Sequence, residues 1–254
     1  MKIISLVENT SRSGNIDSEH GLSLYIEACG KRILFDMGQG ELFYENARKL
    51  QVDLSLVDIA IISHGHYDHG GGLEKFLEIN DIAPIYIREN AFLPYYNGER
   101  YIGLDARLEQ CGRLVTVSDT HSLCNGLTLL SLEVAPDDTG RLMLRQGKRF
   151  IPDSFNHEQY LLIEEGGRRV LISGCSHKGV IAIAEHFAPQ VLVGGFHFMD
   201  MPLDDALIAR GERLNRLDCD FYTCHCTGES QYKFLTKYMK RISYLSAGEQ
   251  IVID

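Results

Sequence analysis

The sequence lacks a dense block of lysine and arginine, and its formal net charge is -10 over 254 residues. Proteins that hold nucleic acid regardless of its sequence neutralise phosphates with clustered basic side chains. An acidic surface also repels anionic membranes. The charge balance therefore predicts that the partner is neither nucleic acid nor a membrane, and it favours a small-molecule substrate.

Long apolar runs are also missing. The first one, Ile3 to Val7, has about five residues, which is shorter than the roughly 7 to 15 of a secretory signal core. No run approaches the length of a transmembrane helix. The seven cysteines are an odd number without regular spacing, so no disulfide framework is indicated. We expect a cytoplasmic protein with reduced thiols.

No internal repeat is visible, and the length suits one domain over residues 1–254. Helical spacing, with apolar residues such as Leu73, Phe76 and Leu77 on one face, occurs in several segments. Short β-like runs rich in Ile, Val, Leu, Tyr and Phe lie between them. The order predicts an α/β fold in which helices cover both outer faces of two packed sheets. The helical segments are 71–80, 178–187, 206–217 and 229–241, and the strand runs are 2–7, 22–28, 32–36, 58–63, 84–88, 114–117, 128–134, 159–165, 168–173, 191–195, 220–225 and 251–254.

The region from about 88 to 156 is less regular, with Pro, Gly, Asn and Asp scattered through it. We expect loops and short strands near the site there, which would form a substrate-binding or lid region. Six of its side chains could stack on rings or pair with phosphate, although each taken singly is more often an ordinary surface residue. They are Tyr95, Tyr96, Arg100, Tyr101, Arg107 and Arg145.

The densest chemical signal is SHGHYDHGGG, residues 63–72, directly after the apolar run 57–63. In an extended segment His64 and His66 point the same way, whereas Asp68 and His69 follow the turn and can face a second point. Imidazole nitrogen and carboxylate oxygen suit zinc, iron or manganese. The spacing predicts two metal positions at the carboxyl end of a strand.

The run His64-x-His66-x-Asp68-His69 resembles the H-x-H-x-D-H signature of the metallo-β-lactamase superfamily. The resemblance extends over nearly the whole chain and is closest to the branch that contains the dihydropterin-ribofuranosylaminobenzene-phosphate synthase of methanopterin biosynthesis. It implies a four-layer αββα sandwich with a dinuclear metal site along one edge. The stretches that carry it, besides 63–72, are EHGLS (19–23), LFDMGQ (34–39), ISGCSHKG (172–179), GGFHF (194–198) and HCTG (225–228).

The resemblance implies two further ligands. His177 would complete the site of His64 and His66, and His225 would join Asp68 and His69. Many hydrolases of the superfamily carry a bridging aspartate where this chain has Cys175. Cys175 either ligates as a thiolate or packs while His177 takes over.

His197 follows an apolar strand and two glycines, and the choice between ligand, catalytic group and hydrogen-bonding neighbour is open from position alone. We predict that it acts beside the metals rather than as a ligand. Asp36 is expected to orient a ligand imidazole. His157 is expected either to support a ligand or to lie on the surface, and His20 either to contact the site or to cap the backbone. We expect His121 and His186 to be exposed, and Cys224 and Cys226 to pack in the core.

Three functions compete at this point. The first is a metal-dependent hydrolase, with two divalent transition-metal ions (zinc first, manganese or iron as alternatives) that activate a bridging water against a phosphoester, lactone or similar ester. Asp68 and His197 would be its catalytic residues. The second is a transferase like the pterin-branch synthase, and the third is a non-catalytic metal-binding sensor. The sensor would be indicated by a broken ligand set, and the set that the resemblance implies is complete.

Overall fold

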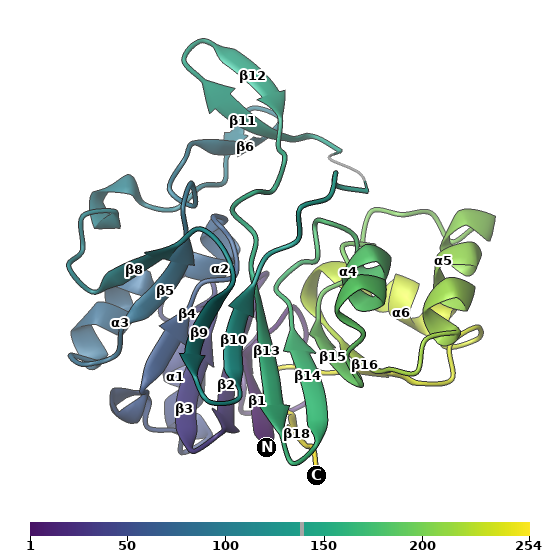
Figure 1. The fold of residues 1–254 in the computed structure, drawn as a ribbon, viewed down its shortest axis with the longest axis horizontal. Helices are drawn as coiled ribbons and strands as arrows, with labels where there is room; N and C mark the ends of the chain where they lie inside the picture. Colours follow the sequence, from purple (N-terminus) through teal and green to yellow (C-terminus); the bar gives the residue numbers. More distant parts are fainter. Residues whose placement is uncertain (138–139) are drawn as a thin grey trace.

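The computed structural model describes residues 1–137 and 140–254, and two seven-stranded sheets form its centre (Figure 1). The first sheet has the order β18-β1-β2-β3-β4-β5-β8. Its strands are β1 (Lys2–Val7), β2 (Ser23–Ala28), β3 (Lys31–Phe35), β4 (Ile59–Ile61), β5 (Ile85–Arg88), β8 (Leu114–Val117) and β18 (Gln250–Val252).

The second sheet has the order β17-β16-β15-β14-β13-β10-β9. Its strands are β9 (His121–Cys124), β10 (Leu127–Leu130), β13 (Tyr160–Glu165), β14 (Arg168–Ile172), β15 (Val191–Gly194), β16 (Asp220–Thr223) and β17 (Ile242–Tyr244).

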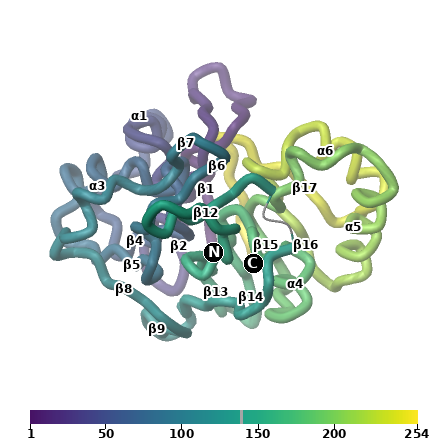
Figure 2. The backbone as a smooth tube through the Cα atoms, turned by 90° about the horizontal axis from the view of Figure 1, so that it is seen from above, coloured from purple at the N-terminus to yellow at the C-terminus, as the bar shows by residue number. Residues whose placement is uncertain are grey.

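Helices lie on the outer face of each sheet (Figures 1 and 2). The helices α1 (Leu42–Lys49), α2 (Tyr67–Gly70) and α3 (Leu73–Ile79) accompany the first sheet, and α4 (Val180–Phe187), α5 (Asp205–Asn215) and α6 (Glu229–Leu235) cover the second. Short 3₁₀ turns lie at Leu54–Leu56, Ala106–Leu108 and His225–Thr227. The predicted four-layer αββα arrangement is therefore confirmed.

Three apolar clusters hold the layers together. The central one fills the space between the sheets, with Ile26 and Ile33 from the first and Leu161 and Ile163 from the second, all fully buried. Two outer clusters join each sheet to its helices. Because strands buried on both faces read as continuous apolar runs, the sequence could reveal them directly.

The parallel strands bring the site together. β3 pairs parallel with β4, and β14, β15 and β16 are parallel neighbours. Parallel strands end at the same edge of their sheet, so the segments after their carboxyl ends meet there. Each of the sequence stretches rich in His, Asp and Cys follows one of these ends.

A third, four-stranded sheet projects above this edge, in the order β12-β11-β6-β7 (Figure 1). Its strands are β6 (Tyr95–Asn97), β7 (Arg100–Tyr101), β11 (Leu142–Gln146) and β12 (Arg149–Pro152). We call residues 94–104 and 140–152 the arm. A cluster of Tyr95, Ile102, Leu142 and Phe155 packs its base. In the view from above, the arm crosses over the middle of the sandwich (Figure 2).

Several local expectations differ from the structure. The strand expected at 128–134 ends at Leu130. The run expected to continue to His225 ends at Thr223, and His225 begins a 3₁₀ turn instead. The strands β6, β7, β11 and β12 are too short to show a period in sequence. None of the helices in the described part of the chain is long and apolar enough to cross a membrane.

Replacing Leu161 by alanine should weaken the whole sandwich, because this side chain is fully buried between the two sheets. We expect a loss of about 2–5 kcal/mol in the free energy of unfolding, measured by urea denaturation. The control is Leu203→Ala, since Leu203 is 49% exposed and its loss should cost under about 0.5 kcal/mol. Equal midpoints for the two variants would contradict this account of the core.

Candidate metal centre

The segment after β4 turns sharply into α2 and buries its polar side chains. His64, His66 and His69 are 0–4% exposed, and Asp68 is 7% exposed. Gly65 is required here because a Cβ at this position would lie 2.1 Å from the carbonyl oxygen of Ala91. The glycine therefore serves close packing between two backbone segments rather than a special turn.

The first group of potential ligands consists of His64, His66 and His177, whose side-chain nitrogens lie within 4.8 Å of one another. The Nε2 atoms of His64 and His177 are 3.3 Å apart. The Nε2 of His66 is buried and has no hydrogen-bond partner in the described structure. Buried polar atoms almost always have a hydrogen-bond partner. Three imidazole nitrogens that converge, one of them without such a partner, are therefore suited to binding a metal cation.

The second group surrounds Asp68. Its Oδ2 lies 3.3 Å from the Nε2 of His225, 3.3 Å from the Nε2 of His20 and 3.6 Å from the Nε2 of His69. The Nε2 atoms of His69 and His225 are 3.1 Å apart. The structure thus brings together the side chains of each group predicted from sequence, and His20 lies with the second group.

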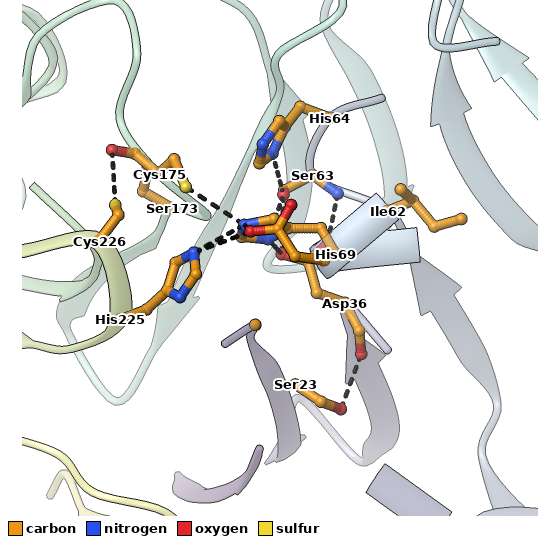
Figure 3. A network of polar contacts seen from close by, with 12 residues as sticks. Ser23, Asp36, Ile62, Ser63, His64, His69, Ser173, Cys175, His225 and Cys226 are labelled. Carbon is orange, nitrogen blue, oxygen red and sulfur yellow. Dashed lines mark hydrogen bonds and ion pairs between the residues drawn. The ribbon is translucent and has the colours of Figure 1, made fainter. Parts of the chain in front are cut away.

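Cys175 lies close to members of both groups, and its contact with His69 is drawn in Figure 3. Its Sγ is 3.2 Å from the Nε2 of His69, and it forms a compact set with His64 and His69. Cys226 also lies at the site, within 4.8 Å of Cys175 and His225 by its ligand atom, and it lines the cavity. Cys224 packs in the central core, as expected. Cys226 is buried as well, with 3% exposed, but it lies at the cavity because β16 ends before it.

Asp36 fixes the orientation of His69, as expected (Figure 3). Its Oδ2 lies 2.7 Å from the Nδ1 of His69 and 2.7 Å from the Oγ of Ser63, and its Oδ1 accepts the Ser63 backbone N–H. The Ser63 hydroxyl is in turn 2.8 Å from the Nδ1 of His64. One buried carboxylate therefore leaves the Nε2 atoms of both imidazoles facing the centre.

Two more buried carboxylates hold the loops that carry His177 and His225. Glu158 accepts the backbone N–H groups of His177 and Lys178. Glu8 accepts the backbone N–H of His225 at 2.7 Å. The Nδ1 of His225 lies 2.7 Å from the side-chain oxygen of Asn9, which sets the direction of its ring.

Backbone strain gathers at the same place. Five of the nine described non-glycine residues with positive φ lie here, at angles of 49° to 60°: Asp36, Phe155, Ser176, His197 and His225. This conformation raises the free energy of any residue other than glycine, so it persists only where the surrounding structure imposes it. Its concentration around the two ligand groups supports a functional role for this edge.

The histidines of the two ligand groups differ in pKa. Burial and then neighbouring imidazoles lower the pKa of His64 and His177 well below the usual value, and burial lowers the pKa of His66 to about 3. Burial alone would also lower the pKa of His69, but Asp36 and Asp68 outweigh it and raise this pKa to about 9. Near neutral pH the first group is therefore uncharged, which is the form of histidine that binds metals.

His197 lies beside the first group, with its ring centroid 4.4 Å from that of His177 and a hydrogen bond to Cys226. His157 accepts the Gly65 N–H through Nδ1 and contacts Asp153 through Nε2, so it is a buried neighbour of the ligands. His121 and His186 are exposed, as expected.

A cavity of about 440 Å³ opens over both ligand groups, which is the size of a small-molecule site. Of the six side chains considered for substrate binding, only Arg100 lines it. Tyr67 and Arg210 line it as well, and no sequence signal pointed to either. Tyr95 is instead buried with its ring 4.0 Å from that of His157, and Arg107 pairs with the neighbouring Asp105 on the surface.

The fold and this site define a family. Residues 17–222 match the model of the metallo-β-lactamase superfamily, and the chain belongs to it. Members of this superfamily usually bind divalent metal ions, and the donor set described above, of imidazole, carboxylate and thiol groups, fits such ions.

Three relatives each cover at least 91% of the chain. An uncharacterized protein of Methanocaldococcus jannaschii is 30% identical, with 91% of each chain covered. The 7,8-dihydropterin-6-methyl-4-(β-D-ribofuranosyl)-aminobenzene-5'-phosphate synthase of the same organism is 28% identical over 99% of this chain and 96% of the relative. A crystal structure described as a metal-dependent hydrolase of the β-lactamase superfamily has a TM-score of 0.85 at 30% identity, with 100% and 99% coverage.

The purified protein should bind up to two transition-metal ions per chain. Elemental analysis after reconstitution with zinc, manganese and iron in turn measures this. His64→Ala and His225→Ala should each remove about one equivalent because they belong to different groups, and His121→Ala is the exposed control. Magnesium should bind weakly, since it prefers octahedral oxygen ligands. A wild-type protein that takes up none of the three metals would contradict the assignment.

Proposed function

We propose that this protein is a metal-dependent hydrolase of a small phosphoester, lactone or similar ester. The observation that carries the proposal is the convergence of two ligand groups, around His66 and around Asp68, at the floor of one cavity. Two divalent ions held there would supply Lewis acidity and lower the pKa of a bound water toward neutrality.

Asp68 has a second role in this proposal besides holding a metal. Its carboxylate is buried, and His69, His20 and His225 outweigh the effect of burial to keep its pKa well below the usual range. It therefore stays a charged acceptor at neutral pH. A hydrogen bond from the attacking water to Oδ2 would orient that water toward the substrate in the cavity.

His197 is proposed as the group that protonates the leaving oxygen or hydrogen-bonds the developing negative charge. It lines the cavity beside His177, whose Nε2 faces the first ligand group. In our proposal six other residues fill the ligand positions, and His197, which lines the cavity and contacts Cys226, acts on the substrate. The six are His64, His66, Asp68, His69, His177 and His225.

Asp68→Asn should abolish activity more completely than it removes metal. An amide oxygen still coordinates a cation, but it is a poor acceptor for orienting a water. We expect at least about a 100-fold loss of kcat with most of the metal retained, measured on a panel of phosphodiester, phosphomonoester, lactone and thioester substrates. Asp17→Asn, at an exposed position, is the control. Near-normal turnover in the Asp68 variant would argue against water activation at this site.

His197→Ala separates proton transfer from metal binding. If His197 acts on the substrate, both metals stay and turnover falls by about 10²- to 10⁴-fold. Loss of one equivalent of metal would instead make His197 a ligand, and unchanged turnover would reduce it to a structural residue. Metal content and kcat are measured on the same preparation, with His186→Ala as the exposed control.

A second candidate function is a transferase, and the observation that favours it is the 28% identity to the dihydropterin synthase over nearly the full length of both chains. In its reaction the ribofuranosylaminobenzene phosphate would attack the methylene carbon of a dihydropterin-methyl pyrophosphate in the same cavity; the C–O bond to pyrophosphate breaks, pyrophosphate leaves, and the attacking group loses a proton. Incubation with both compounds, followed by mass spectrometry of the products, distinguishes it from the hydrolase. A joined product in the absence of ester hydrolysis would replace the first proposal.

A further inference from the structure

The arm carries a charge opposite to that of the rest of the protein. It contains five of the basic residues and only one acidic residue, although the chain as a whole has 25 basic and 35 acidic residues. The basic residues are Arg100, Arg141, Arg145, Lys148 and Arg149, and the acidic one is Glu99. A basic element above the cavity of an acidic protein raises the local concentration of anionic ligands there.

The arm is fastened to the metal-ligand segment itself. The backbone N–H of Tyr67 donates to the carbonyl of Ile102 at 2.8 Å, and His66 forms an antiparallel bridge with Gly103. Tyr67 stands between two proposed metal ligands in the sequence. Any side chain held against Tyr67 therefore has a fixed position close to the ligand groups.

Arg100 is such a side chain. Its Nη2 donates to the Tyr67 hydroxyl at 2.8 Å, and its guanidinium carbon lies 5.0 Å from the centre of the Tyr67 ring. Among the described residues no carboxylate forms an ion pair with Arg100. The other guanidinium in the cavity wall, that of Arg210, is neutralised by Asp137 at 2.9 Å. Arg100 thus presents an uncompensated positive charge to the cavity.

We propose that Arg100, held in place by Tyr67, binds a phosphoryl group of the substrate on the arm side of the cavity. The inference rests on the proposed function for its premise that this cavity is the substrate site. The planar guanidinium matches the oxygens of a phosphoryl group in a two-point hydrogen bond. Stacking on Tyr67 limits the freedom of the side chain, so less entropy is lost when the anion binds.

The test uses phenylphosphonate, an anion without an ester bond, and isothermal titration calorimetry on the metal-loaded protein. Arg100→Met should raise the dissociation constant by about 10- to 100-fold, because a charge-assisted two-point contact is lost. Arg145→Met is the matched control. Arg145 belongs to the same arm and also contacts a tyrosine hydroxyl, that of Tyr96, but it lies outside the cavity lining. Its replacement should change the dissociation constant less than about twofold.

Three results would overturn the proposal: no phenylphosphonate binding by the wild type, equal binding by Arg100→Met, or equal weakening by Arg145→Met. Metal analysis of each variant confirms that the ligand groups are intact. Because binding is measured without turnover, the two proposals fail separately. A protein that hydrolyses no ester but binds the anion through Arg100 would refute only the hydrolase.

Discussion

The carboxylate of Asp36 is the constraint on which the site depends. It follows β3 at a positive φ, is fully buried, and accepts hydrogen bonds from the Ser63 backbone and hydroxyl while facing the Nδ1 of His69. A buried carboxylate without these partners would be very costly, so the partners must stay in place. The same contacts that satisfy Asp36 therefore aim the imidazoles of His64 and His69 at the centre.

Buried carboxylates also position the ligand segments on the other side of the site. Glu8 and Glu158 are buried carboxylates that accept the backbone N–H groups of His225 and His177, and each also accepts from a tyrosine hydroxyl, Tyr244 and Tyr160 respectively. These contacts hold the loops that carry the ligands. Acidic residues far apart in the chain thus arrange a site made mostly of histidine, and the packed sheets supply the rigid frame.

Cys175 and Cys226 add two sulfur atoms, which are soft potential metal ligands, to the site. A thiol beside the imidazoles of His64 and His69 favours zinc or iron over magnesium and manganese if it ligates as a thiolate. Burial and the neighbouring Cys226 raise the pKa of Cys175 well above its usual value, whereas hydrogen bonds from Cys175 and His197 outweigh burial and lower the pKa of Cys226.

The sequence by itself determined the layered fold and the centre of the site. The strands and helices could be predicted because apolar periodicity is a local property of the sequence. The centre of the site could be predicted because four potential metal ligands lie within six residues, from His64 to His69. The resemblance to the metallo-β-lactamase superfamily then pointed to His177 and His225, and the structure brings both to the expected groups.

Only the tertiary structure decided which distant residues join them. His20 and Cys226 reach the cavity because strand ends and loops from different parts of the chain meet at one edge of the sandwich. Such contacts between distant segments produce no periodic pattern in the sequence. The arm is the clearest case: its strands have two to five residues, too few to show alternation, and they are strands only because they pair with one another. That pairing is what brings Arg100 to the cavity and leaves Arg145 outside it.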